Sequence, residues 1–281
     1  MGTLTENELT ILQDAFGRLL QDRCNEQQVR GWMENRQGFD DSLWKAIAEM
    51  GITGLLVDEK YGGTDAGTVA VERIMEQAGA NLLGAPLLAS AVMSVAAIQA
   101  SEDEEAKARL LPGIAAGSSI ATLLITKEAG DWSEAHVGLH AKHSKDGWLL
   151  NGTASLVIHG RSADIWLAVA NTDKGSTLFE LPRDAQGTSS SPLPSFDHTM
   201  VLDQITLKDS PATQVGKIGA GWQSIEEALS IGLVALAGEQ AGGAQKILDI
   251  TVDYAKIRHQ FGRPIGSFQA IKHMAANLLL E

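Results

Sequence analysis

The chain has 281 residues, a length that allows one large domain or two ordinary ones with a substantial core. Its 35 acidic residues outnumber its 22 lysines and arginines, which gives a formal charge of −13 and a pI near 5.0. A surface this negative repels phosphate backbones, so nucleic acid is not an expected partner. The single cysteine, Cys24, cannot form an internal disulfide or a thiolate zinc site, and we expect a cytoplasmic protein without a bound metal.

The first zone, residues 1–116, has the period of α-helices and is predicted to form an N-terminal helical domain. Apolar residues recur at helical spacing from Leu9 to Leu20 and from Leu43 to Met50, and glycines separate the helices. The uncharged stretch 77–101 contains Gln, Asn, Pro and Ser residues. It therefore predicts a buried helix rather than a membrane span.

The second zone, residues 117–217, is predicted to be an antiparallel, β-barrel-like middle domain. Short β-rich runs such as 120–126, 165–169 and 201–207 are separated by Gly, Asn, Asp and Ser. The segment 187–195, with four serines and two prolines, predicts an exposed loop. His143, His159 and His198 have neither triad nor metal spacing, so we expect them on the surface or in loops.

The third zone, residues 218–281, predicts a helix of roughly 35 residues followed by a partial helix from Ser267. The expected apolar stripe consists of Ile225, Leu229, Leu233, Leu236, Ala244, Ile247 and Leu248. A helix this long implies a bundle, and we expect an incomplete C-terminal helical domain. The run Met274–Glu281 lacks a C-terminal cap, so its leucines at 278–280 are expected to need a partner chain.

The end of the long helix carries the most informative motif. Arg258 falls in its last turn, where a guanidinium suits phosphate binding or simply complements the helix dipole. Gln269 opens the following helix, where its amide can donate to phosphate or ribose oxygens. The spacing alone leaves both interpretations of Arg258 open.

This segment resembles the acyl-CoA dehydrogenase family, whose long helix ends in Tyr-x3-Arg-x2-Phe-Gly-x-Pro-Ile and continues to Phe-Gln. The matching residues are Tyr254, Arg258, Phe261, Gly262, Pro264, Ile265, Phe268 and Gln269. Two further stretches, Glu49–Gly63 and Gly147–Gly152, resemble family signatures in the same order, although Asp58 stands where proline is usual. The resemblance covers the chain from about residue 5 to its end.

The resemblance implies an FAD-dependent oxidoreductase that removes hydrogen across the α,β-bond of an acyl-CoA thioester. It implies a role in fatty acid or steroid side-chain β-oxidation and an electron-transfer acceptor. In the family, the matching arginine and glutamine contact the FAD of a neighbouring subunit. Arg258 and Gln269 are therefore expected to complete a partner's cofactor site with Phe261 nearby, which requires a homo- or hetero-oligomer.

The flavin loop departs from the family pattern. The family's Thr-Glu-Pro-x-x-Gly-Ser corresponds to the stretch 126–132, which retains Thr126 and lacks the serine. On the next strand, Ile158 stands where the family has threonine, so a hydrogen-bonding hydroxyl is lost. We expect these changes to weaken FAD binding by this subunit's own β domain, with Thr126 as its remaining contact.

No catalytic base is identified. Most family members carry the glutamate further along the C-terminal bundle than residue 281, and a minority carry it at the position that aligns with Gly232. The substrate-contacting arginine beside it aligns with Leu233. Glu239 lies two turns further on roughly the same face and is the weak candidate for a displaced base; the alternative is a structural hydrogen-bond partner.

Three functions follow from these residues. The first is a shortened, inactive dehydrogenase. The second is one half of a hetero-oligomer whose other subunit supplies the base. The third is an assembly protein without redox function. The altered flavin loop favours the hetero-oligomer. The acyl chain, the stoichiometry and the electron acceptor are not determined by the sequence.

Overall fold

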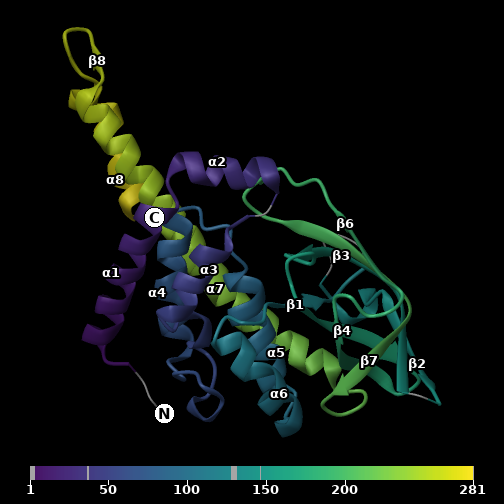
Figure 1. The fold of residues 1–281 in the computed structure, drawn as a ribbon. Helices are drawn as coiled ribbons and strands as arrows, with labels where there is room; N and C mark the ends of the chain where they lie inside the picture. The colour runs from purple at the N-terminus through teal and green to yellow at the C-terminus, as the bar shows by residue number, and fades with distance from the viewer. Residues whose placement is uncertain (1–3, 37, 128–131, 146, 281) are drawn as a thin grey trace.

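The computed structural model describes residues 4–36, 38–127, 132–145 and 147–280, and Figure 1 shows a helical region beside a sheet, with α7 running past both. The helices of the N-terminal region are α1 (Glu6–Arg23), α2 (Glu26–Asn35), α3 (Asp41–Glu49), α4 (Gly67–Ala80), the π-helix η3 (Leu87–Ser94), α5 (Val95–Ala100) and α6 (Glu104–Ala115). Short 3-10 turns, η1 (Ile52–Gly54) and η2 (Glu59–Tyr61), connect α3 to α4. The predicted domain boundaries at 116 and 217 remain predictions.

Side-chain caps determine where several of these helices begin. Thr5 and Asn25 each form a reciprocal capping box with the residue three positions later, Glu8 and Gln28. Asp103 accepts hydrogen bonds from the first turn of α6 and also from the backbone nitrogen of Gly216, at 2.9 Å. The cap of α6 therefore also ties the helical region to the end of the sheet.

The sheet closes on itself, because β5 pairs with both β4 and β7 in the order β1-β4-β2-β3-β7-β5. This agrees with the predicted barrel-like middle region. Most pairings are antiparallel, whereas β4 pairs in parallel with β1 and with β2. The strands are β1 (Ala121–Leu124), β2 (Leu139–Ser144), β3 (Gly147–Ile158), β4 (Ile165–Thr172), β5 (Gly175–Pro182), β6 (Thr188–Pro192) and β7 (Leu202–Val215).

The segment 187–195 is not the loop that its serines and prolines predict. Residues Thr188–Pro192 form the edge strand β6, which pairs with β7 from Leu207 to Asp203. Most of its side chains are exposed, because the strand lies at the border of the sheet and has no core to face. Proline at the end of an edge strand costs no ladder hydrogen bond, so the composition misled the prediction.

The stretch 77–101 is buried, as predicted, but it is broken rather than one helix. It comprises the end of α4, a turn through Gly84 and Pro86, the π-helix η3 and then α5. Helix α4 ends at Ala80 with Asn81 as its C-cap, and the wider π turn begins directly after Pro86. No helix in the described part of the chain combines the length and hydropathy that a membrane crossing requires.

Helix α7 (Gly221–Ile257) packs along α4 and α5 through small residues rather than through the predicted apolar stripe. A Cβ on Gly238 would lie 2.5 Å from the carbonyl oxygen of Glu72, and one on Gly242 would overlap that of Glu76. Gly79 of α4 similarly faces the backbone of Glu239. The glycines therefore allow direct contact between the two helix backbones.

The stripe prediction is correct for Ile225, which is buried, and wrong for Leu233, Ala244 and Ile247, because glycine and alanine form most of the buried face of α7. Leu233 is 66% exposed and Ile247 is 67% exposed, although both belong to the predicted stripe. The hydrophobic period correctly located the helix. It assigned the wrong face, since a close backbone approach excludes large side chains.

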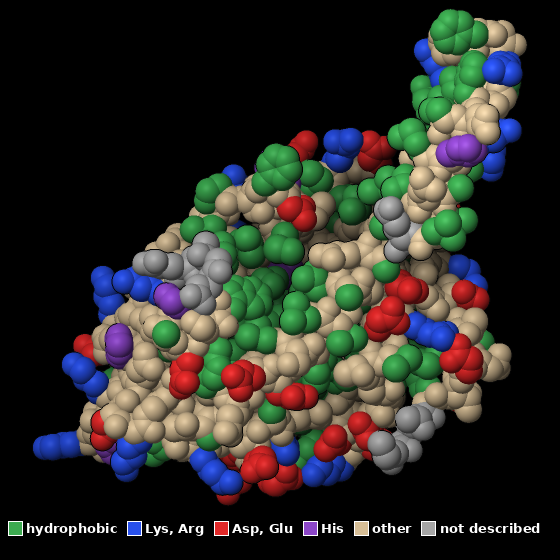
Figure 2. Space-filling view, turned by 180° about the vertical axis from the view of Figure 1, so that it is seen from behind, with side chains coloured by type: hydrophobic (Ala, Val, Ile, Leu, Met, Phe, Trp, Pro, Cys, Tyr) green, Lys and Arg blue, Asp and Glu red, His purple; other side chains and the backbone are tan. Residues whose placement is uncertain are grey.

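We call residues Ile247–Leu280 the C-terminal arm. It comprises the end of α7, the hairpin β8 (His259–Gln260) and β9 (Arg263–Pro264), the turn η5 (Ile265–Ser267) and α8 (Gln269–Leu280). The arm projects from the body, and α8 returns beside the end of α7 (Figure 1). Its exposed apolar side chains are Ile247, Ile250, Tyr254, Ile257, Phe261, Met274, Leu278, Leu279 and Leu280, and they appear as green clusters on the projection in Figure 2.

The glycine contacts predict opposite effects for two adjacent substitutions. Gly242→Ala places a methyl group on the Glu76 carbonyl and is expected to lower the free energy of unfolding by about 1–3 kcal/mol. Gly243→Ala meets only the Gly79 oxygen, at 3.8 Å, and is expected to raise it by up to about 1 kcal/mol. Urea unfolding of both variants checks this, and equal effects would contradict the proposed backbone contact.

Candidate active site

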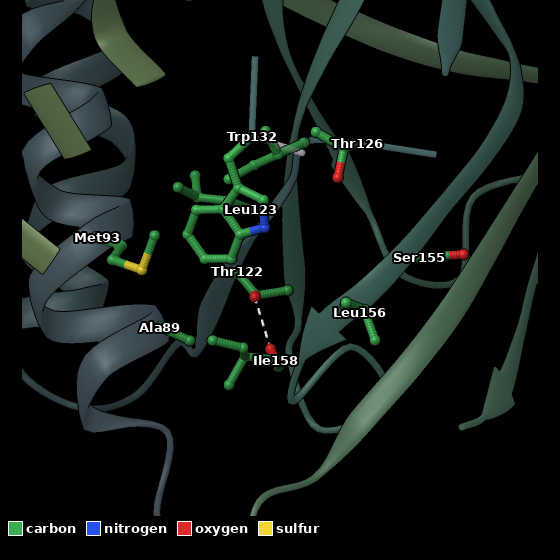
Figure 3. A pocket seen from close by; sticks show the side chains of 10 residues that line it. Ala89, Met93, Thr122, Leu123, Thr126, Trp132, Ser155, Leu156 and Ile158 are labelled. Atoms are coloured by element: carbon green, nitrogen blue, oxygen red, sulfur yellow. Dashed lines mark hydrogen bonds between the residues drawn. The ribbon is translucent and has the colours of Figure 1, made fainter. Parts of the chain in front are cut away.

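A cavity lies between the π-helix η3 and the strands β1 and β3. We call it the central cavity. Its walls are largely apolar, and Figure 3 shows the Trp132 ring standing between Met93 and the sheet. The lining residues are Ala89, Met93, Thr122, Leu123, Ile125, Thr126, Trp132, Ser155, Leu156 and Ile158.

The sheet holds Thr126 and Ile158 at fixed positions in this cavity. The carbonyl oxygen of Thr126 accepts a hydrogen bond from the Ser155 nitrogen at 2.9 Å, and its side chain is buried. The Thr122 hydroxyl donates to the carbonyl oxygen of Ile158 at 2.6 Å, the dashed line of Figure 3. Ile158 therefore offers the cavity only an apolar surface, as the loss of threonine at this position predicts.

A bulge in β3 presents Leu156 to the same cavity. The register between β3 and β7 shifts between Ala154 and Val157, and Leu156 has a positive φ of 54°. A leucine rarely adopts this conformation, and bulges of this kind redirect side chains near functional sites. This bulge could not be predicted, because residues 154–157 include neither glycine nor asparagine.

Gly232 faces the central cavity's Met93 and places no functional group there. A Cβ at Gly232 would lie 3.1 Å from Met93 Cγ, so the methionine fills the space beside the helix. Leu233, where the family pattern has arginine, is turned towards the outside. The sequence did not identify Met93 as a site residue.

Glu239, the weak candidate for a displaced base, does not line the central cavity. It lines a neighbouring cavity, which we call the distal cavity. Burial, followed by the nearby charge of Asp197, raises the pKa of Glu239. The structure thus separates Glu239 from Thr126 by the wall that Ala89 and Ile158 form between the two cavities.

Arg258, Phe261 and Gln269 lie together on the C-terminal arm, apart from Thr126. Arg258 is the residue that ends α7, and its carbonyl oxygen accepts from the Ile265 nitrogen at 2.8 Å, which closes the hairpin. All three residues are exposed, and Phe261 is 91% exposed at a positive φ of 54°. Figure 1 shows this hairpin at the far end of the arm from the sheet.

The prediction that the three histidines lie on the surface or in loops is met by His159 only in part, because His159 lies in the turn after β3 but is buried. His143 and His198 are exposed, but His159 is 3% exposed and packs edge-on against Phe39, with ring centroids 5.7 Å apart. It sits at the end of β3 with a positive φ, which turns its side chain inward. Burial lowers the pKa of His159 to about 4, partly offset by a hydrogen bond to the Gly84 backbone.

The acidic and histidine side chains of the described residues do not gather into a group of three that could hold a metal ion. The titratable groups of the site are therefore dispersed. Glu239 and His159 belong to the distal cavity, and Arg258 belongs to the arm.

Models of a known protein family match both the N-terminal helical region and the C-terminal helices of this chain. The family model for the acyl-CoA dehydrogenase N-terminal domain matches residues 6–118, and the model for the C-terminal domain matches residues 219–281. Acyl-CoA dehydrogenase IpdE2 from Mycolicibacterium smegmatis is 28% identical over 275 residues. The match covers 98% of this chain and 73% of the relative.

Two solved structures share the fold. The Tcur3481–Tcur3483 steroid ACAD is 31% identical with a TM-score of 0.86, and the match covers 98% of this chain and 73% of that chain. The ChsE4–ChsE5 complex from Mycobacterium tuberculosis is 25% identical with a TM-score of 0.84, and the match covers 99% and 74%. The chain belongs to the acyl-CoA dehydrogenase family, whose members are oxidoreductases acting on CH–CH bonds.

The buried histidine predicts acid sensitivity. Between pH 6.5 and about 4 the unfolded chain binds a proton that folded His159 does not, so stability falls as the pH drops through this range. The expected loss is about 3 kcal/mol across the whole window. Asn tolerates the positive φ at this position, so His159→Asn should fold and should lose that part of the pH dependence.

Urea unfolding of both proteins at pH 7.0, 6.0, 5.0 and 4.5 measures the effect. His198→Asn is the matched control, because His198 is exposed and should contribute no such slope. The interpretation of His159 fails if His159→Asn and wild type lose stability in parallel.

Proposed function

We propose that this chain is a subunit of an FAD-dependent acyl-CoA dehydrogenase, which oxidises the Cα–Cβ bond of an acyl-CoA thioester with a base from a second, related subunit. The observation that carries this proposal is the division of site residues between two surfaces. Thr126 lies in the central cavity, whereas Arg258 and Gln269 lie on an exposed arm beyond its reach. Such an arrangement is completed by another subunit.

The central cavity fits the flat ring system of FAD in its chemistry. Apolar walls with few polar groups suit an aromatic ring, and Trp132 offers a stacking surface. Thr126 would hold the ring's polar edge, and Leu156 and Ile158 would pack against its face. Because Gly232 places no base beside this cavity, the FAD that accepts the hydride from the β-carbon would be the one bound in the partner's active site.

The proton on the α-carbon needs a base that Gly232 cannot supply. The glycine lies against Met93, and Glu239 is directed into the distal cavity. We therefore assign base and hydride acceptor to one active site in the partner, and we assign to this chain the completion of that site by Arg258 and Gln269. The guanidinium would bind FAD phosphate oxygens bidentately.

The exposed apolar side chains of the arm support association. Several clusters of exposed apolar side chains on a projecting helix pair are costly in water, and interfaces bury such side chains. The names of two matched structures describe complexes, Tcur3481–Tcur3483 and ChsE4–ChsE5. We propose a hetero-oligomer with another acyl-CoA dehydrogenase subunit for this chain, with electrons leaving through an electron-transfer acceptor.

The alternative is an assembly subunit without redox function, and Ile158 favours it. Its backbone oxygen is occupied by Thr122 and its side chain cannot donate to a flavin. In that case the chain would bind the partner and leave its flavin content unchanged. The arm would then serve only as an interface.

Flavin content distinguishes these functions. The chain is purified alone and together with the acyl-CoA dehydrogenase encoded beside it, and the flavin absorbance is recorded before and after addition of an acyl-CoA. We expect bleaching only in the pair. Bleaching by the chain alone overturns the need for a partner base, and flavin-free preparations in both cases favour the assembly subunit.

Arg258→Ala in the pair is expected to weaken FAD retention at least tenfold, because a charge-assisted hydrogen bond is worth about 1.5–3 kcal/mol. Lys256→Ala is the matched control, since it removes a cation from the same turn that pairs only with Asp253 in the described structure. Dialysis against increasing FAD measures both affinities. Equal retention by the two variants would remove Arg258 from the cofactor site.

Leu279→Glu is expected to disrupt the pair, because it places a carboxylate in an apolar surface that the partner covers. Asn277→Glu adds the same charge at an exposed polar position of α8 and should leave the association intact. Analytical ultracentrifugation at micromolar concentration compares the two. A pair that survives Leu279→Glu places the interface elsewhere.

A further inference from the structure

The charges of this chain are unevenly distributed, and the far part of the C-terminal arm is basic. Residues Tyr254–Leu280, which we call the basic segment, contain four lysines and arginines and no aspartate or glutamate. The other 18 of the 22 lysines and arginines, and all 35 acidic residues, lie outside this segment. Figure 2 shows the contrast, with blue side chains along the projection and red ones concentrated on the body.

Most cations of the basic segment have no counter-charge within this chain. Lys256 Nζ lies 2.9 Å from Asp253 Oδ1, so this lysine is paired. Arg258, Arg263 and Lys272 are exposed, and no carboxylate of the described residues pairs with them. Three positive charges of the arm are therefore free to meet another molecule.

Aromatic rings hold the Arg263 side chain in place. Its guanidinium carbon lies 4.2 Å from the centroid of the Phe268 ring, and Phe268 in turn packs edge-on against Phe261, with centroids 6.1 Å apart. A guanidinium that rests with its face on a ring keeps the N–H donors at its edge available. Arg263 is therefore pre-organised to bind an anionic group beside the exposed ring of Phe261.

Lys272 lies on the face of α8 that the proposed function assigns to the interface. It precedes Leu279 by seven residues, which is close to two helical turns, so the two side chains share one face. Both are exposed in this chain. A partner that covers Leu279 also takes Lys272 out of water, and a desolvated ammonium group is costly unless a negative charge faces it.

Resting on the proposed function, we propose that the arm docks in a groove of the partner subunit that is apolar and carries carboxylates opposite Arg263 and Lys272. The proposed function assigns Arg258 to the phosphates of FAD, which leaves these two cations for protein side chains. The partner is thus recognised by its charge as well as by its apolar surface. Opposite charges at such an interface fix the register of the arm and accelerate association.

The occupant is a protein groove rather than an anionic membrane. A helix that lies on a membrane buries one apolar face and keeps the other in water. The leucines Leu278–Leu280 are all exposed, and because successive helical residues are about 100° apart, they cover roughly 200° of the circumference of α8. Exposed apolar side chains also lie on α7 and on the hairpin, at Ile257 and Phe261. A surface that covers all of them has to surround the arm.

Carbodiimide crosslinking of the flavin-loaded pair tests the contact directly, because it joins a lysine amine to a carboxylate that touches it. Mass spectrometry should find Lys272 linked to an aspartate or glutamate of the partner. The Lys256–Asp253 pair of this chain, at 2.9 Å, serves as the internal positive control. Lys272→Arg keeps the charge without the reactive amine, so it should retain the pair and lose the link.

Affinity provides the second measurement. Lys272→Glu should weaken the pair by about tenfold or more, because it sets two carboxylates against each other. Lys174→Glu makes the same charge change at an exposed turn of the sheet and should alter the affinity little. The association rate of the wild-type pair should fall as salt is raised from about 20 to 300 mM. Thermal unfolding of each variant serves as the folding check.

The outcomes separate this inference from the proposed function. It is overturned if the control link forms without a link from Lys272, if Lys272 links to a second copy of this chain, or if Lys272→Glu and Lys174→Glu weaken the pair equally. Phosphatidylglycerol vesicles that bind the assembled pair, and lose that binding on Lys272→Glu, would assign the arm to a membrane and also overturn it. In all these cases pair formation and flavin bleaching still support the proposed function. Absence of a pair at every salt concentration overturns both.

Discussion

The contact between the backbones of α4 and α7 determines the position of nearly every functional residue in this chain. Gly238 and Gly242 let α7 approach the carbonyl oxygens of α4, and Gly79 does the same from the other side. This contact leaves no freedom for either helix to slide. It therefore fixes Gly232 against Met93 and directs Glu239 into the distal cavity. The cavities are a consequence of helix placement, and the sheet supplies their opposite wall.

Helix α7 has a second role, which is to present apolar side chains on the outside of the molecule. Because small residues occupy most of the buried face of α7, several of its larger apolar residues are exposed, such as Leu233, Ile247 and Ile250, and they become more frequent towards the arm. A protein that buried them internally would need a thicker helical layer. Family members share this architecture, and the proposed function assigns the outward residues to a partner. Core packing and association are thus divided between two faces of one helix.

The sequence predicted the long helix, the barrel-like zone and the family, because apolar period and the Arg258 motif are local signals. It did not predict which face of α7 is buried, since the glycine contact depends on the position of α4 rather than on the hydrophobic pattern. The burial of His159, the edge strand β6 and the bulge at Leu156 were missed for the same reason: each depends on residues distant in the chain. The roles of Arg258, Gln269, Phe261 and Thr126 remain predictions.

Because α7 is continuous, it fixes both the distance and the rotation angle between Glu239, which lines the distal cavity, and the C-terminal arm. Arg258, the C-cap of α7, follows Glu239 by 19 residues, and the helix between them is unbroken up to Ile257, with each residue rotated by about 100° around the axis. Inserting or deleting one residue between them would leave both motifs intact and would rotate the arm by roughly that angle about the body. In the proposed hetero-oligomer, the partner would then meet a different face of the arm. The proposed function therefore requires a constant length in this segment, unlike in surface loops.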